Sequence, residues 1–106
     1  MARTLITVAP NAKRGEIIEI RTLIAHPMET GLRPGADGQV LPRNLIRRFV
    51  CRFNGEPVFS ADLYAAVAAN PLLSFTMLAT SSGTLSFSWE GDNGFAQTEN
   101  VALSVT

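Results

Sequence analysis

The sequence has few of the residues that build metal centres, redox sites and disulfide frameworks. Its 106 residues include one cysteine and one histidine. A single cysteine cannot form an intrachain disulfide or a multi-cysteine zinc site, and a single histidine leaves little for a histidine-rich metal site. The sequence also has no net excess of positive or negative charge, because nine Lys and Arg balance nine Asp and Glu. We therefore expect neither a general nucleic-acid binder nor a binder of anionic membranes, and the composition points away from enzymes.

Long hydrophobic runs are missing as well, although 46% of the residues are hydrophobic. No segment approaches the ~20 apolar residues of a membrane span. The first ten residues hold only a short alternating run, without the apolar stretch of about 7–15 residues that a secretory signal needs. The residues alone predict one packed domain over 1–106 and, by default, a cytoplasmic protein.

Alternating apolar and polar residues are the dominant pattern, as in half-buried β-strands. The clearest examples are residues 85–90, with Leu85, Phe87 and Trp89 on one face, and residues 101–105. Between these segments, Gly91-Asp92-Asn93-Gly94 is typical of a hairpin turn. The segment lacks the further oxygen ligands of an EF-hand calcium loop, so we interpret it as a turn.

Five further strands are expected, at 4–8, 16–24, 45–53, 58–59 and 72–79. In the 45–53 strand the alternation assigns Leu45, Phe49, Cys51 and Phe53 to the buried face and Ile46, Arg48, Val50 and Arg52 to the outer face. Arg47 falls on the apolar face, so we expect it near a strand end. The alanine-rich segment 61–70 is the one helix candidate. The pattern predicts an all-β, immunoglobulin-like antiparallel β-sandwich of about seven strands, with one long loop and at most one short helix.

The long loop covers residues 26–43 and is rich in proline and glycine. A loop of this length in a small domain is usually functional or flexible, so it is the first candidate for a site. Arg43, Arg47, Arg48 and Arg52 form a basic run after it. This run is either a solvated outer face or a mixed apolar and basic surface that docks an acidic partner.

Cys51 and His26 are the only residues that could form a nucleophile–base pair. Cys51 lies in register with buried aromatic residues, which favours an inert core thiol over a catalytic one. An interchain disulfide through Cys51 is the stronger of the functional alternatives. His26 precedes a proline at a strand end, which favours a structural or loop-orienting role over metal binding. The sequence predicts no metal, cofactor or catalytic residue.

Ordered segments along nearly the whole chain, about residues 5–105, resemble the SoxZ family, whose members are subunits of the SoxYZ sulfur carrier of bacterial thiosulfate oxidation. The most specific segments are His26-Pro27-Met28-Glu29-Thr30-Gly31 and Phe53-Asn54-Gly55 followed by Pro57-Val58-Phe59-Ser60-Ala61-Asp62. Asp37-Gly38, Pro42-Arg43, Arg48-Phe49, Asn70-Pro71, Leu73-Ser74-Phe75, Ser82-Gly83-Thr84 and Phe87-x-Trp89 also match. The turn at 91–94 departs from the acidic Asp-Asp-Gly turn that is more typical of the family.

The resemblance implies a non-catalytic subunit that forms a periplasmic heterodimer with SoxY. SoxY carries sulfur intermediates on a cysteine in its flexible tail, where other Sox enzymes act on them. This chain ends in a strand without such a tail, and Cys51 lies in mid-strand. The resemblance also implies export together with SoxY, which carries the twin-arginine signal, and it replaces the cytoplasmic default by the periplasm.

From the loop, the mixed face and the resemblance together, we predict a partner surface formed by His26, Met28, Glu29, Arg43 and Arg48. An isolated chain with an uncovered strand edge could also form a homodimer. Two alternatives stay open at this point. One is a free-standing β-sandwich that binds another protein, and the other is a thiol-dependent sulfurtransferase that uses Cys51 and His26.

Overall fold

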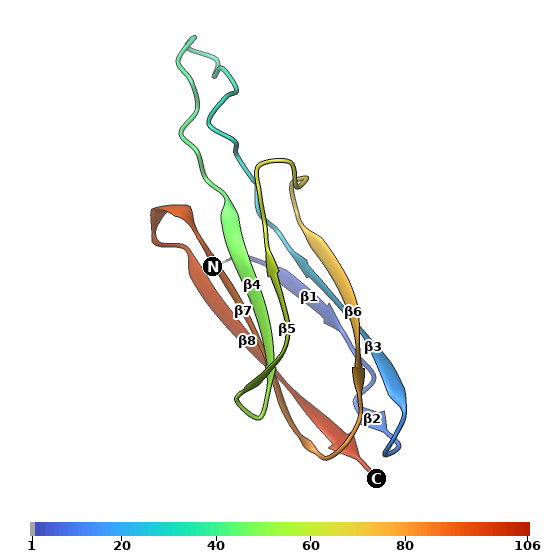
Figure 1. The fold of residues 1–106 in the computed structure, drawn as a ribbon. Coiled ribbons are helices and arrows are strands. Elements are labelled where there is room, and N and C mark those ends of the chain that lie inside the picture. The colour runs from blue at the N-terminus through green and yellow to red at the C-terminus, as the bar shows by residue number, and fades with distance from the viewer. Residues whose placement is uncertain (1) are drawn as a thin grey trace.

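The computed structural model describes residues 2–106, which form two β-sheets packed face to face (Figure 1). One sheet has three strands in the order β1-β3-β6, and the other has five in the order β2-β8-β7-β4-β5. The strands are β1 (Thr4–Thr7), β2 (Asn11–Ala12), β3 (Ile17–Ile24), β4 (Ile46–Phe53), β5 (Glu56–Asp62), β6 (Leu72–Leu78), β7 (Gly83–Gly91) and β8 (Ala96–Val105). This arrangement confirms the predicted all-β sandwich. Met1, part of the predicted domain 1–106, lies outside the described residues.

The inner faces of the two sheets share one hydrophobic core. Its largest fully buried side chains include Trp89, Phe49 and Phe87 from the five-stranded sheet and Ile20 from the three-stranded sheet. The Phe49 ring lies 5.3 Å from Trp89 and 6.0 Å from Phe75 of β6, measured between ring centroids. Each such side chain contributes about 1.5–3 kcal/mol of burial energy, so this aromatic cluster joins the two sheets firmly.

The seven predicted strands are present, with wider bounds for several of them. β5 is longer than the expected 58–59, and β8 begins at Ala96 rather than near Val101. The two-residue β2 was not expected, and it pairs parallel to β8, whereas the other pairs are antiparallel as predicted. A pair this short leaves too little periodicity to be detected in the sequence.

The helix candidate at 61–70 does not form a helix, which agrees with the expectation of at most one short helix. Ala61 and Asp62 complete β5 and pair with Phe49 and Arg48 of β4. Leu63 is then buried, and the Val67 amide donates to the Tyr64 carbonyl in a single turn. A helix of ten residues is marginal on its own, so extending the β4–β5 ladder and burying Leu63 stabilise the strand instead.

The predicted alternation on β4 is wrong at Ile46, and Val50, also expected on the outer face, is buried. Ile46, expected on the outer face, is fully buried, and both Arg47 and Arg48 are exposed. The β4–β7 register shifts between Ile46 and Arg48, which marks a β-bulge. A bulge changes which residues face the core, and it also places Arg47 near the strand end as expected.

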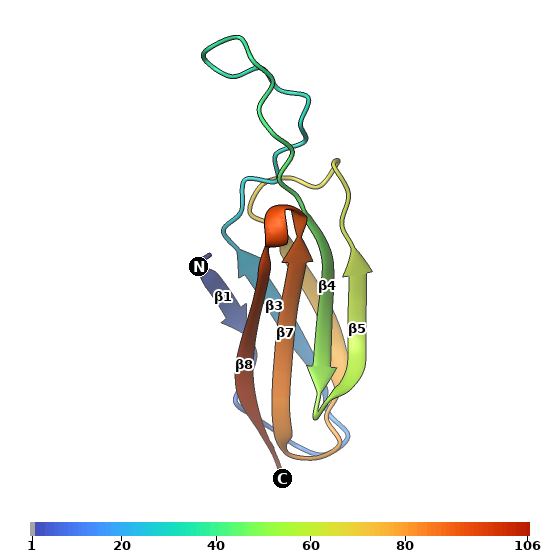
Figure 2. The same ribbon diagram turned by 90° about the vertical axis from the view of Figure 1, so that its left-hand side faces the viewer.

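The long loop forms an arm, residues 30–43, that extends beyond one end of the sandwich (Figures 1 and 2). At its base Glu29 and Asn44 exchange two backbone hydrogen bonds, each 2.8 Å long. Further out, the Leu41 amide donates to the Arg33 carbonyl at 2.8 Å, and Pro34 pairs with Val40. The arm is therefore a narrow ribbon held by its own backbone, and it begins beside the 91–95 turn and the 63–71 connection (Figure 2).

Candidate functional site at the base of the arm

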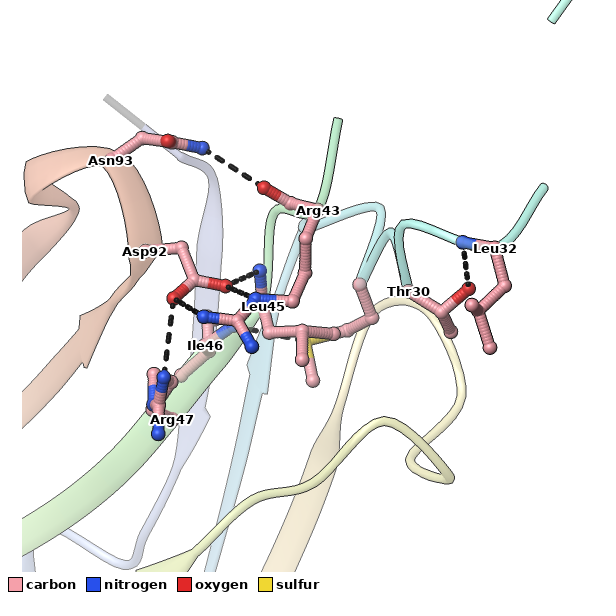
Figure 3. Close-up of polar contacts among 9 residues, drawn as sticks. Thr30, Leu32, Arg43, Leu45, Ile46, Arg47, Asp92 and Asn93 are labelled. Atoms are coloured by element: carbon pink, nitrogen blue, oxygen red, sulfur yellow. Dashed lines mark hydrogen bonds and ion pairs between the residues drawn. The ribbon is translucent and has the colours of Figure 1, made fainter. Parts of the chain in front are cut away.

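Asp92 forms the centre of an ionic network where the arm meets the sandwich (Figure 3). Its carboxylate accepts hydrogen bonds from Arg43 Nη2 at 3.1 Å and from the Leu45 amide at 3.1 Å. Arg43 Nε lies 3.0 Å from Asp92 Oδ2, and Arg47 Nη1 lies 3.6 Å from Asp92 Oδ1. The side chain of Asp92 is about 10% exposed, whereas the two arginines are more than half exposed. Asp92 thus holds two guanidinium groups in place while leaving them accessible.

The tight 91–95 turn makes this network possible. The Asp92 amide donates to the Leu45 carbonyl at 2.8 Å, and Asn93, at φ +59°, donates through Nδ2 to the Arg43 carbonyl at 3.2 Å. A Cβ at Gly91 would overlap the Leu45 carbonyl oxygen and lie 2.9 Å from the Ile46 Cα. Glycine at 91 is therefore required for the close approach of the turn to the start of β4.

The pKa of Asp92 lies below its usual range. Partial burial raises the pKa of this carboxyl, but the Leu45 amide, the Arg43 hydrogen bond and the charges of Arg43 and Arg47 together outweigh that effect. Asp92 is therefore ionised at neutral pH and keeps both ion pairs.

An open hollow of about 570 Å³ lies beside this network. Arg48 pairs with Asp62 across it at 2.8 Å, and the exposed Tyr64 contributes to its rim. The hollow is lined by Thr30, Arg43, Leu45, Arg47, Arg48, Asp62, Leu63, Tyr64 and Ala65. We call Arg43, Arg47, Arg48, Asp62 and Asp92 the arm-base cluster; it carries three positive and two negative charges.

Two of the predicted surface residues, His26 and Met28, are buried. His26 Nδ1 accepts the Met28 amide at 3.1 Å, and its ring packs edge-on against Phe95 at 5.1 Å between centroids. Its Nε2 has no hydrogen-bond partner within residues 2–106. Burial lowers the pKa of His26, although the nearby charge of Asp92 partly opposes this. His26 is thus a neutral residue beneath the arm, which matches the expected loop-orienting role and places its ring away from the surface.

Met28 links the arm to the β4 bulge. Its backbone is left-handed at φ +50°, and its sulfur accepts a hydrogen bond from the Ile46 amide at 3.3 Å (Figure 3). The thioether thus supplies an acceptor to a buried backbone donor beside the bulge. Met28 therefore supports the arm base from inside rather than from the predicted partner surface.

Glu29, Arg43 and Arg48 are the predicted partner residues that lie toward the surface. Glu29 binds Arg33 at 2.7 Å, and the hydrogen bond from Arg33 holds the pKa of Glu29 below its usual range. Arg43 belongs to the Asp92 network, and Arg48 lines the same hollow. Arg43 and Arg48 line the same hollow, while Glu29 is paired with Arg33 of the arm.

Cys51 is a core residue, fully buried between its neighbours on β4. Burial raises the pKa of its thiol to about 11, so very little thiolate exists at neutral pH. Neither ring nitrogen of His26 bonds Cys51 in the part of the chain that the structure describes. An interchain disulfide through Cys51 would require the sandwich to open.

Arg47, Asp62, Tyr64 and Asp92 were not predicted as site residues. The sequence pattern could have identified Arg47, because this charged residue interrupts the predicted apolar face of the 45–53 strand. Asp92 was interpreted only as part of a turn, because nothing in the sequence links it to Leu45 and Arg43, which lie 47 and 49 positions earlier. Tyr64 lay within the helix candidate at 61–70.

The described residues 2–106 contain neither a cluster of metal ligands nor a membrane-spanning helix. No group of three or more His, Cys, Asp and Glu side chains could hold a metal ion there. No helix in the same residues is long and apolar enough to cross a membrane.

Two solved structures share the sandwich fold with low sequence identity. A superoxide reductase (neelaredoxin) from Ignicoccus hospitalis has a TM-score of 0.76 at 16% identity, covering 99% of this chain and 82% of that chain. The sulfur carrier protein SoxY from Chlorobium limicola f thiosulfatophilum has a TM-score of 0.66 at 14% identity, covering 97% of this chain and 78% of that chain. At these identities the likeness shows the fold alone.

Comparison of the sequence identifies the family more specifically than the likeness in fold does. No curated protein matches the chain. The family model described as sulphur oxidation protein SoxZ matches residues 6–102, nearly the whole chain. This protein therefore belongs to the SoxZ family of sulfur-oxidation proteins.

Proposed function

We propose that this protein is the non-catalytic subunit of a SoxYZ-type sulfur carrier and that it binds a SoxY-type subunit through the arm-base cluster. Family membership supports a role in sulfur oxidation. The arm-base cluster is the observation that carries the choice of surface. It presents three half-exposed arginines, and the exposed Tyr64 lines the hollow beside them; both residue types are enriched at interface hot spots.

The cluster suits a protein partner because it is already ordered. Asp92 fixes Arg43 and Arg47 before any partner arrives, which reduces the entropy lost on binding. Its surplus of one positive charge favours an acidic patch on the partner. The carrier chemistry itself belongs to the partner in this proposal, since Cys51 is buried with a raised pKa. Other Sox enzymes would then meet this chain only through the loaded carrier.

The first measurement is native mass spectrometry after co-expression with a SoxY-type subunit, with and without reductant. We expect a one-to-one complex that survives reduction. A complex seen only without reductant would assign the contact to Cys51, and no complex under either condition would reject the proposal.

The surface is tested by titration calorimetry of variants that stay outside the core. Arg48→Glu and Tyr64→Ala should each weaken partner binding by about fivefold or more, because interface anchors cost more than about 1 kcal/mol on removal. The matched control is Arg14→Glu, which reverses an exposed arginine outside the arm-base cluster. Equal effects from Arg14→Glu and Arg48→Glu would show that net charge, not this surface, governs binding.

We further propose that the protein works in the periplasm after export as a complex with a signal-bearing partner. Fractionation of cells that express this chain with and without the partner tests the route. Periplasmic recovery should depend on the partner, and recovery in the cytoplasm in both cases would reject it.

A further inference from the structure

The outer face of the three-stranded sheet exposes several large hydrophobic side chains. We call it the outer sheet face; its exposed side chains belong to β1, β3 and β6 (Figure 1). Four of the large hydrophobic residues exposed in residues 2–106 lie on it: Leu5 at 62%, Ile17 at 71%, Leu72 at 64% and Leu78 at 54%. So much exposed apolar surface on one small face is typical of a contact surface.

The strand register arranges these residues in cross-strand rows. At one end Leu5, Leu23 and Leu72 are direct neighbours across the three strands. At the other end Ile17 lies opposite Leu78. Apolar rows therefore form both ends of the face.

The two rows between them are polar and carry opposite charges. Arg21 lies opposite Ser74, and Glu19 lies opposite Thr76. Arg21 donates to Glu19 through Nε at 2.7 Å, and both side chains are more than half exposed. Within residues 2–106 Arg21 donates its side-chain hydrogen bond through Nε, so its terminal nitrogens stay available to a second carboxylate.

We propose that the outer sheet face binds a second copy of this chain about a two-fold axis that crosses the strands between the Glu19 and Arg21 rows. Such an axis reverses the strand direction, so each row meets its counterpart from the opposite end. Leu23 then faces Ile17 of the second copy, and Arg21 faces Glu19 of the second copy. Leu72 likewise faces Leu78 of the second copy.

Charge decides between the possible two-fold arrangements. An axis that ran along the strands would place Arg21 on Arg21 and Glu19 on Glu19, which costs free energy through like-charge repulsion. The axis across the strands pairs opposite charges and apolar rows at the same time. Of these two arrangements, only the axis across the strands makes the face self-complementary, which is the condition for a closed dimer.

The size of the outer sheet face sets the expected affinity of the dimer. Three short strands bury less than the roughly 800 Å² per partner of a standard stable interface. We therefore expect a weak, reversible dimer with a dissociation constant of about 10–100 µM. This surface is separate from the arm-base cluster, so the dimer does not depend on the proposed partner contact.

Sedimentation equilibrium of the full chain under reducing conditions tests the proposal. The wild type should shift from monomer to dimer between about 5 and 500 µM. Arg21→Glu and Leu72→Asp should each raise the dissociation constant about tenfold or more. The double swap Glu19→Arg with Arg21→Glu should restore it to within about threefold, because both the internal pair and the pair between copies are rebuilt.

The matched control is Leu32→Asp, the same change at a leucine of the arm that is 84% exposed. It should leave the dimer unchanged. The proposal is overturned by a wild type that stays monomeric at the highest concentration, by a double swap that fails to restore association, or by a control that abolishes it.

Titration of Arg21→Glu with a SoxY-type subunit separates this proposal from the proposed function. Unchanged partner binding is expected. Loss of partner binding together with a monomeric wild type would assign the outer sheet face to the partner and reject the homodimer.

Discussion

The arm-base cluster and the outer sheet face are both exposed, but they are built in different ways. The arm-base cluster combines residues from the arm, β4 and the 91–95 turn, and it depends on Asp92 reaching Arg43 and Leu45. The outer sheet face depends only on the register of β1, β3 and β6. One surface is charged and internally paired, and the other is mostly apolar at its ends.

This difference has consequences for how each surface responds to change. A surface built from register keeps its backbone geometry after a single side-chain substitution, because the backbone ladder positions the neighbouring residues. A surface built from a turn packed on a bulge fails when one backbone contact is lost. The following predictions test this contrast.

The largest effect is expected at Gly91. Gly91→Ala places a Cβ against the Leu45 carbonyl and should destabilise the fold by about 3 kcal/mol, which urea unfolding measures. Gly94→Ala is the matched control in the same turn, with nothing within 4 Å of its Cβ and a φ of +73°. Backbone strain alone should cost it about 1–2 kcal/mol. Equal losses in both variants would mean that the close approach at Gly91 is not what builds the arm base.

Salt should separate the two surfaces. Raising NaCl from about 50 to about 500 mM should weaken binding of the SoxY-type subunit about tenfold, because exposed arginines carry the proposed contact. The dimer of the outer sheet face should weaken by no more than about threefold, since apolar rows supply most of its contact. Calorimetry and sedimentation at both salt concentrations measure the two constants. The reverse order of sensitivity would contradict the assignment of the surfaces.

Acid should act on the arm base through Asp92. Its folded pKa is lowered, so the stability from its ion pairs is fully present above the unfolded pKa of about 3.9 and is lost as pH falls through the folded value. The wild type should lose free energy of unfolding more steeply below about pH 4 than Asp92→Asn does. Urea unfolding across pH 2.5–6, in steps of about 0.5, measures the slopes. Parallel slopes would show that Asp92 gains nothing from the network.

The smallest effect is expected from His26, the single histidine of the sequence. Burial lowers its folded pKa below the unfolded value of about 6.5, so protonation favours the unfolded chain. Stability should therefore rise slightly between about pH 5 and pH 7.5 in the wild type. His26→Asn keeps an acceptor for the Met28 amide and should flatten this rise. A rise that persists in the variant would exclude His26 as its origin.

Much of the fold was predictable from local pattern. The alternation of Leu85, Phe87 and Trp89 identified β7, and Gly91-Asp92-Asn93-Gly94 identified a turn that the structure shows with positive φ at Asn93 and Gly94. These features depend on neighbours in sequence, where side-chain period and backbone preference act directly. The family was also recognisable from its segments and is confirmed by the match over residues 6–102.

The site was only partly predictable. Cys51 was correctly placed in the core. Arg43 and Arg48 line one hollow at the surface, and their role in partner binding stays a prediction. His26 and Met28 were expected at the surface because they belong to the long loop, yet the structure buries both. Their burial depends on Phe95 and on the Ile46 amide, which no local pattern connects to them.

The amino-acid sequence by itself determines the strands, the main turns, the inert position of Cys51 and the family. Only the tertiary structure decides that β4 carries a bulge, that residues 61–62 extend β5, and that Asp92 holds Arg43 and Arg47 together. The physical reason is the range of the interactions. Periodicity and turn preference act over a few residues, whereas the contacts of Asp92 join residues 45 or more positions apart, and their energies exist only once β4 has paired with β7.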